Sequence, residues 1–311
     1  MHSTDVNSPA RASSVHNRDV IFFALVGLSI LISWRPIFTL LNLAWHVDEY
    51  THILLILPVS LSLLYLERSK FRNVTYARAS GIVLGIVAIA VAIGVRTCDF
   101  DHSDDFSLSI AIFSLVLFWM ACIVGCYGGR VFKSLLFPFL FLFLLVPPSA
   151  SVLDKSIVFL QTASTEATVK LFNLVGLPVL QNGFILSFPT LRIEVAKECS
   201  GIRSSLMLLL TGLILAHLFL RPLWSKVIFV LLIVPFSVAK NAVRIFTLSM
   251  LAMYVNPGFL YGRLHHEGGI VFFLIALAGL MFLLWILQRL GNKPVPQSVG
   301  SPALSTADPT K

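Results

Sequence analysis

Long apolar segments alternate with short polar loops along almost the whole chain. An α-helix needs about 20 apolar residues to cross a hydrocarbon core of about 30 Å, and most of these segments approach or exceed that length. The pattern therefore predicts about eight transmembrane helices. We expect them at about 20–41, 51–66, 80–95 and 106–127, in a fifth run that ends at Val146, and at about 202–220, 226–255 and 268–290.

The segment from about 150 to 198 departs from this pattern. Residues 150–176 are moderately apolar but carry many polar side chains, which are costly against lipid. These include Asp154, Lys155, Gln161, Glu166 and Lys170. We expect a helix that lies on the membrane surface or dips into it. The following residues, 176–195, alternate around Gly183 and Pro189 and indicate a short β-hairpin. Together, 150–198 should form an external or interfacial cap.

The composition agrees with a membrane protein. Of the 311 residues, 57% are hydrophobic and only 12% are charged, whereas a soluble domain has roughly 25% charged residues. The predicted fold class is an all-α polytopic integral membrane protein. The net charge of +8 fits basic loops beside membrane spans, so we expect no nucleic-acid partner. The four cysteines lack the spacing of a zinc site or a CxxC motif, and neither a metal nor a cofactor is expected.

The loop charges predict the orientation. Basic loops near residues 11–18, 67–78 and 130–133 alternate with acidic links near 48–49 and 99–105. Because basic loops remain in the cytoplasm, both termini should be cytoplasmic and the cap should face outward from a bacterial cytoplasmic membrane. Residues 1–19 would be a cytoplasmic N-terminal segment, 20–290 the membrane domain, and the Pro/Ser/Thr-rich residues 291–311 a disordered cytoplasmic tail.

Three reactive residue types fall on the predicted external face. Cys199 directly precedes the sixth span, and His265 and His266 directly precede the last one. Arg244 follows cytoplasmic Lys226 by 18 residues, which corresponds to about 27 Å of straight helix. Such a helix nearly crosses the membrane, so the cysteine, arginine and histidines should share one depth.

This combination is chemically coherent. A thiolate can attack a carbonyl carbon, and an imidazole can move the proton to the leaving amine. A fixed guanidinium can stabilise the oxyanion that develops in the tetrahedral intermediate. Gly201, close to Cys199, would let a substrate backbone approach.

Each residue also has a simpler structural interpretation. A free cysteine often packs as a small hydrophobe, an interfacial arginine often anchors a helix end, and a histidine pair before a span is often an interfacial polar pair. Three further residues are supporting candidates with the same ambiguity. Asn241 lies one turn before Arg244, Arg203 could bind a substrate carboxylate or tether its helix, and His52 could line the site or anchor its span.

Several motifs resemble the exosortase/archaeosortase family of prokaryotic membrane cysteine transpeptidases. The strongest are Glu198-Cys199-Ser200-Gly201-Ile202-Arg203, Asn241-Ala242-Val243-Arg244-Ile245, and His265 with Gly269 four residues later. The sequence Glu49-Tyr50-Thr51-His52 is similar to an early motif of the family, although Ile53 stands where the family often has glycine. The resemblance extends over roughly 20–290.

The resemblance implies specific roles and partners. Cys199 would be the nucleophile, Arg244 the oxyanion-stabilising residue and His265 the acid/base, with His266 as the alternative. The substrates would be exported proteins with a C-terminal sorting signal of the PEP-CTERM type. Such a signal has a short Pro-Glu-Pro-like motif, a hydrophobic helix and a basic end. The protein would cleave the signal at the outer face of the membrane and pass the new C-terminus to an acceptor that the sequence does not identify.

Two other functions were considered. A transporter or channel could use Arg244 and the histidines for an anionic substrate or for protons, but it should hold its ionisable groups near the bilayer midplane. A non-catalytic scaffold of an export assembly would need no reactive Cys199. The clustering at one face favours the enzyme.

Overall fold

The computed structural model describes residues 9–72, 78–97, 105–189, 191–256, 258 and 269–291. The N-terminal elements are α1 (Pro9–Ile32), α2 (Trp34–His46), η1 (Asp48–Tyr50), α3 (Ile53–Leu66), η2 (Arg68–Arg72), α4 (Arg78–Thr97), α5 (Asp105–Tyr127), α6 (Gly129–Ser134), α7 (Leu136–Phe141) and η3 (Leu142–Leu145). The later elements are α8 (Ala150–Leu174), β1 (Leu180–Asn182), β2 (Ile185–Ser187), β3 (Arg192–Glu194), η4 (Lys197–Ser200), α9 (Ile202–Phe219), α10 (Leu223–Tyr254) and α12 (Gly269–Gly291). The helical membrane fold predicted from the sequence is confirmed.

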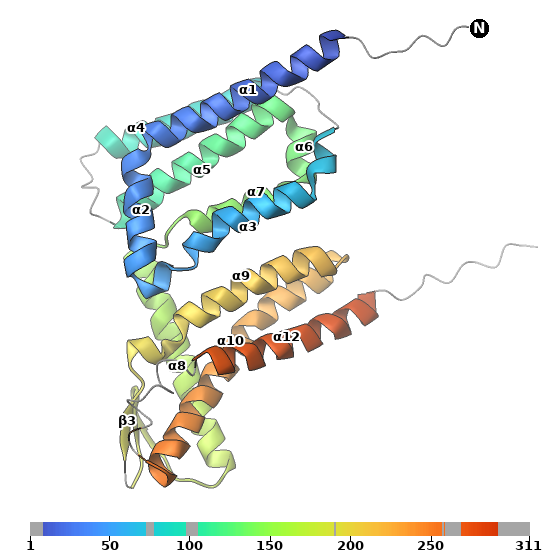
Figure 1. Cartoon of the computed structure of the whole chain (residues 1–311). Helices are drawn as coiled ribbons and strands as arrows, with labels where there is room; N and C mark the ends of the chain where they lie inside the picture. The colour runs from blue at the N-terminus through green and yellow to red at the C-terminus, as the bar shows by residue number, and fades with distance from the viewer. Residues whose placement is uncertain are drawn as a thin grey trace, which may run out of the picture.

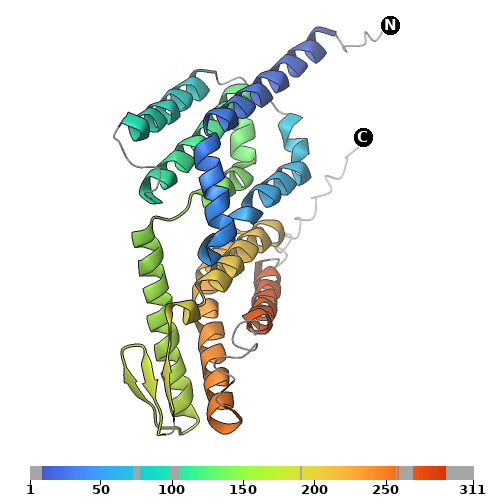
Figure 2. The same ribbon diagram turned by 60° about the vertical axis from the view of Figure 1, so that its left-hand side comes forward.

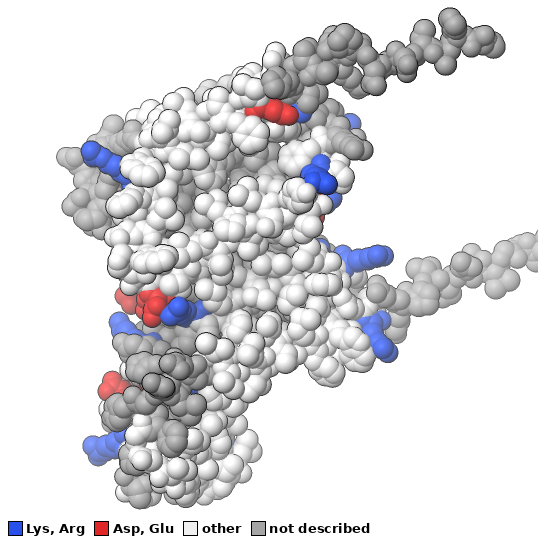
Figure 3. All heavy atoms as spheres, in the orientation of Figure 1, with Lys and Arg blue, Asp and Glu red and all other residues white. Residues whose placement is uncertain are grey.

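Five of the described helices are long and apolar enough to cross a membrane, and the number rises to seven if each of two bent pairs is one span. The predicted number of eight is therefore not confirmed. Helix α4, predicted as the third span, is apolar over the shorter stretch Gly81–Val91. In Figure 3, charged side chains lie mainly toward the ends of the helices, and the flank between them is largely uncharged. Such a surface suits contact with lipid tails.

The first apolar run is not one straight helix. Helix α1 ends at Ile32, and α2 begins at Trp34 after a bend of 73°. The predicted span over 20–41 therefore consists of two helices that meet at a bend. Pro36 explains the break, because proline lacks the N–H that would bond to the carbonyl of Ile32 and its ring clashes there. Trp34 and Trp45 of α2 are 60% and 74% exposed, as in residues that anchor a helix at a membrane interface.

The N-terminal half packs around one apolar core, which α1, α2, α3, α5, α7 and η3 share (Figure 1). Helix α4 lies against α5 through small residues. A Cβ atom on Gly81 would collide with the backbone of Gly125, so the two helices approach more closely there than larger side chains allow. Leu210 of α9 enters the same core and joins the two halves of the chain.

Helix α8 turns away from the preceding span by 97°. The prediction that 150–176 does not continue the span agrees with this bend. The location of α8 at the membrane surface stays a prediction. Figures 1 and 2 both show α8 side by side with the second half of α10. Phe172 of α8 is fully buried there and contacts Phe246 of α10.

The predicted hairpin is a three-stranded antiparallel sheet in the order β1-β2-β3. Leu186 pairs with Ile193, and both are buried against α8 and α10. On the other face of the sheet, Arg192 and Glu194 are exposed. This alternation places the apolar face of the sheet on the two helices.

Helix α10 contacts two different sets of elements along its length. Its first half packs on α9 and α12 through Phe229 and Ile233, and its second half packs on α8 and the sheet through Ile245. Pro235 lies between these halves, within the continuous helix Leu223–Tyr254. Proline within a helix favours a kink. The depth of Arg244 in the membrane stays a prediction.

Candidate active site

Cys199 lies in the tight turn between the sheet and α9. The turn is η4, and the backbone N–H of Cys199 donates to the carbonyl oxygen of Ala196 at 2.9 Å. Cys199 is not in a disulfide and is half-buried, where it packs against the apolar cluster of the sheet, α8 and α10. The thiol thus sits at the boundary between a packed apolar cluster and the open side of the turn.

Asn241 of α10 holds this turn directly. Its Nδ2 donates a hydrogen bond to the carbonyl oxygen of Cys199 at 2.8 Å, and Asn241 is only 1% exposed. A buried, hydrogen-bonded amide fixes both partners more firmly than a solvent-exposed one, because neither can exchange its bond for water. The carbonyl of the candidate nucleophile is therefore anchored to α10.

Gly201 makes this contact possible for two reasons. Its φ is +73°, in the left-handed region where a side chain is unfavourable. A Cβ atom at this position would lie 2.9 Å from Oδ1 of Asn241, closer than real Cβ atoms approach a neighbour. Any other residue would strain the turn and push Asn241 away from Cys199.

Lys240 supports the same turn through a second residue. Its ammonium donates to the hydroxyl of Ser204, and that hydroxyl in turn bonds to the carbonyl oxygen of Gly201 at 3.0 Å. Lys240 is only 7% exposed. Lys240 is not among the site residues predicted from the sequence, although an ionisable residue inside an apolar run, directly before Asn241, is a signal that could have identified it.

Arg244 lies three residues beyond Asn241 and four beyond Lys240, so it shares their side of α10. It is partly buried. The next residue, Ile245, belongs to the apolar cluster on which Cys199 packs. The structure therefore brings Cys199, Asn241 and the Arg244 turn of α10 together by helix packing. Their shared depth in the membrane stays a prediction.

Arg203 lies in the first turn of α9, and His52 directly precedes α3. Arg203 donates from Nη1 to Oδ1 of Asp48 at 2.8 Å, which ties the start of α9 to η1. His52 is 7% exposed, and its Nδ1 bonds to the carbonyl oxygen of Glu49 at 2.9 Å. Because a carbonyl only accepts, Nδ1 carries the hydrogen, and Nε2 is the ring nitrogen that can accept a proton.

The chain matches the family model described as "Transmembrane exosortase" over residues 45–282. The chain belongs to the transmembrane exosortase family. No curated protein and no solved structure matches it. The matched range covers η1, His52, η4 and the whole of α10, so Cys199 and Asn241 fall within it.

Two residues of the exosortase motif set, His265 and His266, lie outside the described residues. Helix α12 starts at Gly269, and the assignment of the acid/base stays a prediction. The cytoplasmic tail predicted over 291–311 also lies outside the described residues, apart from Gly291 at the end of α12. Over the described ranges, no group of three or more His, Cys, Asp or Glu side chains could hold a metal ion.

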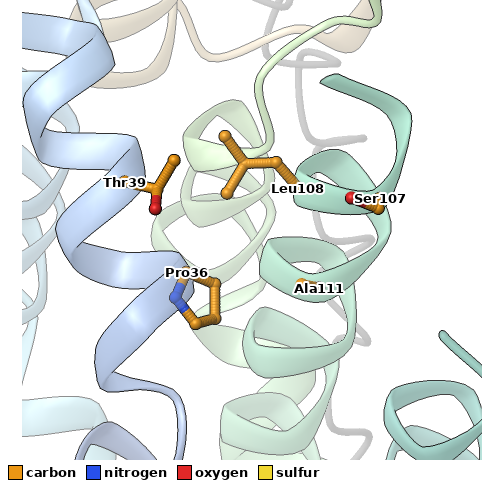
Figure 4. Close-up of a pocket in the computed structure, with 5 residues that line it drawn as sticks. All are labelled: Pro36, Thr39, Ser107, Leu108 and Ala111. Carbon is orange, nitrogen blue, oxygen red and sulfur yellow. The ribbon is translucent and has the colours of Figure 1, made fainter. Parts of the chain in front are cut away.

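A small cavity lies elsewhere in this exosortase, between α2 and α5 (Figure 4). It is lined by Pro36, Thr39, Ser107, Leu108 and Ala111. Its volume of about 20 Å³ is room for a single water molecule. None of the candidate residues lines it, so it is not a substrate site.

Proposed function

We propose that this exosortase family protein is a membrane cysteine transpeptidase that cleaves a C-terminal sorting signal of exported proteins. The observation that carries the proposal is the contact of Asn241 with the carbonyl of Cys199, one helical turn before Arg244. An anchored main chain restricts where the Cys199 thiol can lie relative to α10, and restricted geometry favours attack on a carbonyl.

In the proposed reaction, the Cys199 thiolate attacks the carbonyl carbon of the scissile peptide bond. The negative charge that develops on the carbonyl oxygen is stabilised by Arg244. The C–N bond breaks when His265, or His266 in its place, gives a proton to the leaving amine. A thioester remains on Cys199, and an acceptor nucleophile displaces the thiol to release the new C-terminus.

The proposal includes the location and the partners. The site would face the exterior of a bacterial cytoplasmic membrane, with both termini in the cytoplasm. The substrates would carry a short motif, a hydrophobic helix and a basic end. The helix of the signal would lie in lipid beside the protein and present the motif at the membrane surface, where η4 and the sheet would meet it.

The test is processing of a tagged exported substrate in cells with variants of this chain. Cys199→Ala and Arg244→Ala should abolish processing, whereas Cys126→Ala should leave it unchanged because Cys126 lies in α5 and packs on the N-terminal core. His265→Ala should be inactive and His266→Ala active. The reverse result for the two histidines would move the acid/base to His266. Full processing by the Cys199→Ala variant would refute the proposed cysteine transpeptidase activity.

One observation favours a second function. Lys240 is a buried ammonium inside α10, four residues from Arg244, and paired cations inside a helix suit a transporter of an anionic substrate. In that case transport should survive Cys199→Ala and fail in Lys240→Met. The main-chain anchoring of Cys199 favours the transpeptidase, since a transporter has no need to fix that carbonyl.

A further inference from the structure

Strand β3 is an edge strand of the sheet, and it leads directly to Cys199. In the part of the chain that the structure describes, β3 pairs only with β2. Figure 2 shows the chain rising from the sheet to the start of α9. The edge therefore runs toward the candidate nucleophile.

The hydrogen bonds of the sheet show which backbone groups face this edge. Phe188 donates its N–H to Leu191 at 2.8 Å, and Val195 donates to Phe184 at 2.9 Å. In an antiparallel ladder, bonded residues alternate with residues whose N–H and C=O point away from the partner strand. Between Leu191 and Val195, the outward-pointing residues are Arg192 and Glu194, and both are exposed.

The end of β3 that leads to Cys199 is held in place by a buried hydrogen bond. Nε2 of Gln161, a residue of α8 that is 4% exposed, donates to the carbonyl oxygen of Val195. Glu194 precedes Cys199 by five residues, and an extended chain covers at most about 3.6 Å per residue, or about 18 Å in total. A peptide of about five extended residues on this edge would therefore reach the thiol.

We propose that the extended segment of the substrate next to the scissile bond binds as an added strand along the outer edge of β3. Its main chain would exchange hydrogen bonds with the N–H and C=O groups of Arg192 and Glu194. Main-chain pairing supplies affinity and fixes an extended backbone, and side-chain pockets are not required for it. The inference rests on the proposed function, because it needs a peptide substrate at Cys199.

Proline substitution tests this inference without altering the ladder to β2. Proline is tolerated in an edge strand where the lost N–H points away from the sheet. Glu194→Pro removes both the side chain and the outward N–H of residue 194. Glu194→Ala removes the same side chain but keeps the N–H. Gln181→Pro is the matched control, because Gln181 also has an outward N–H, on the opposite edge at β1.

We expect Glu194→Pro to process a tagged substrate about tenfold less efficiently than Glu194→Ala. The reason is that proline removes one main-chain hydrogen bond to the substrate and weakens the neighbouring ones. Gln181→Pro should equal the wild type, and all three variants should accumulate in the membrane. Equal processing by Glu194→Pro and Glu194→Ala would overturn the added strand. An equal loss in Gln181→Pro would also overturn it, because the effect would then come from the sheet as a whole.

A substrate-side measurement does not depend on how the variants fold. Full-length protein in detergent is given a peptide substrate that is N-methylated at one backbone position at a time. The added strand predicts that cleavage is lost at every second position, where the N–H faces β3. A flat profile would overturn the inference. Absence of cleavage of the unmethylated peptide, and of processing in cells, would instead overturn the proposed function and this inference with it.

Discussion

Asn241 donates a hydrogen bond from Nδ2 to the carbonyl oxygen of Cys199 at 2.8 Å, across 42 positions of sequence. This bond connects the turn before α9 with the second half of α10. Arg244 lies one helical turn beyond Asn241 on the same helix. The candidate nucleophile and the candidate oxyanion-stabilising residue are therefore positioned by one buried amide.

Replacing this amide should uncouple the turn from α10. Asn241→Asp keeps the shape of the side chain but replaces the donor with a carboxylate oxygen that faces a carbonyl oxygen. We expect at least tenfold lower processing of a tagged substrate, because loss of a buried hydrogen bond costs about 1–3 kcal/mol. Asn173→Asp, at an exposed position of α8, is the control and should process normally. Normal processing by Asn241→Asp would show that the bond does not position the site.

Gly201→Ala should disturb the same turn from the opposite side. The left-handed φ of +73° costs an ordinary residue roughly 1–2 kcal/mol, and the new Cβ would also displace Asn241. We expect weaker processing and a lower midpoint in thermal unfolding of the purified protein. The control is Gly129→Ala in α6, where a Cβ meets nothing within 4 Å; it should be neutral or slightly stabilising. Equal midpoints for both variants would contradict the proposed strain.

Lys240→Met distinguishes the role of the Lys240 ammonium group from that of its long aliphatic side chain. The variant retains an unbranched apolar side chain but loses the donor to Ser204, so Gly201 loses part of its support. We expect kcat to fall several-fold and KM to change little, because the turn would be less ordered while the substrate edge at β3 is untouched. Lys170→Met, on an exposed position of α8, should change neither constant. A rise in KM alone would indicate that Lys240 binds the substrate instead.

A second buried polar pair joins α9 to α3 at the end of α9 remote from Cys199. Nε2 of His217 lies 3.0 Å from Oε1 of Glu67, and its ring stacks on Phe137 at 3.9 Å. Both members of the pair are less than 20% exposed. We expect His217→Ala to destabilise the protein by about 1–3 kcal/mol, measured by denaturant unfolding.

The ion pair of Arg203 with Asp48 is the contrasting case. Its side chains are 56% and 74% exposed, and exposed pairs contribute about 0–1 kcal/mol. Asp48→Asn should therefore change stability much less than His217→Ala. If Asp48→Asn is the more damaging of the two, the burial argument for the His217 pair is wrong.

Much of the architecture was predictable from the sequence because lipid imposes a simple rule. A backbone in hydrocarbon must satisfy its own hydrogen bonds, so long apolar runs become helices. The polar residues of 150–176 predicted that the preceding span does not continue, and α8 turns away from it by 97°. The break after Ile32 was missed, although Pro36 was visible, because the apolar pattern continues through it.

The residues of the candidate site were predictable in type but not in arrangement. Cys199, Asn241 and Arg244 stand out as polar groups beside apolar runs. Their meeting place was expected from depth along the helices, whereas the structure shows that the second half of α10 reaches Cys199 by packing on α8 and the sheet. The positions of His265 and His266 remain predictions.

The sequence by itself determined that this is a helical membrane protein, where its apolar helices lie, and which reactive side chains it offers. Those properties depend on local composition and on the solvent that each segment must meet. Only the tertiary structure decided that Asn241 holds Cys199 and that Lys240 supports Gly201 through Ser204. It also decided that β3 is an edge strand of the sheet among the described residues. Such contacts join distant residues through the packing of whole elements, and no local pattern encodes which side chains will face each other.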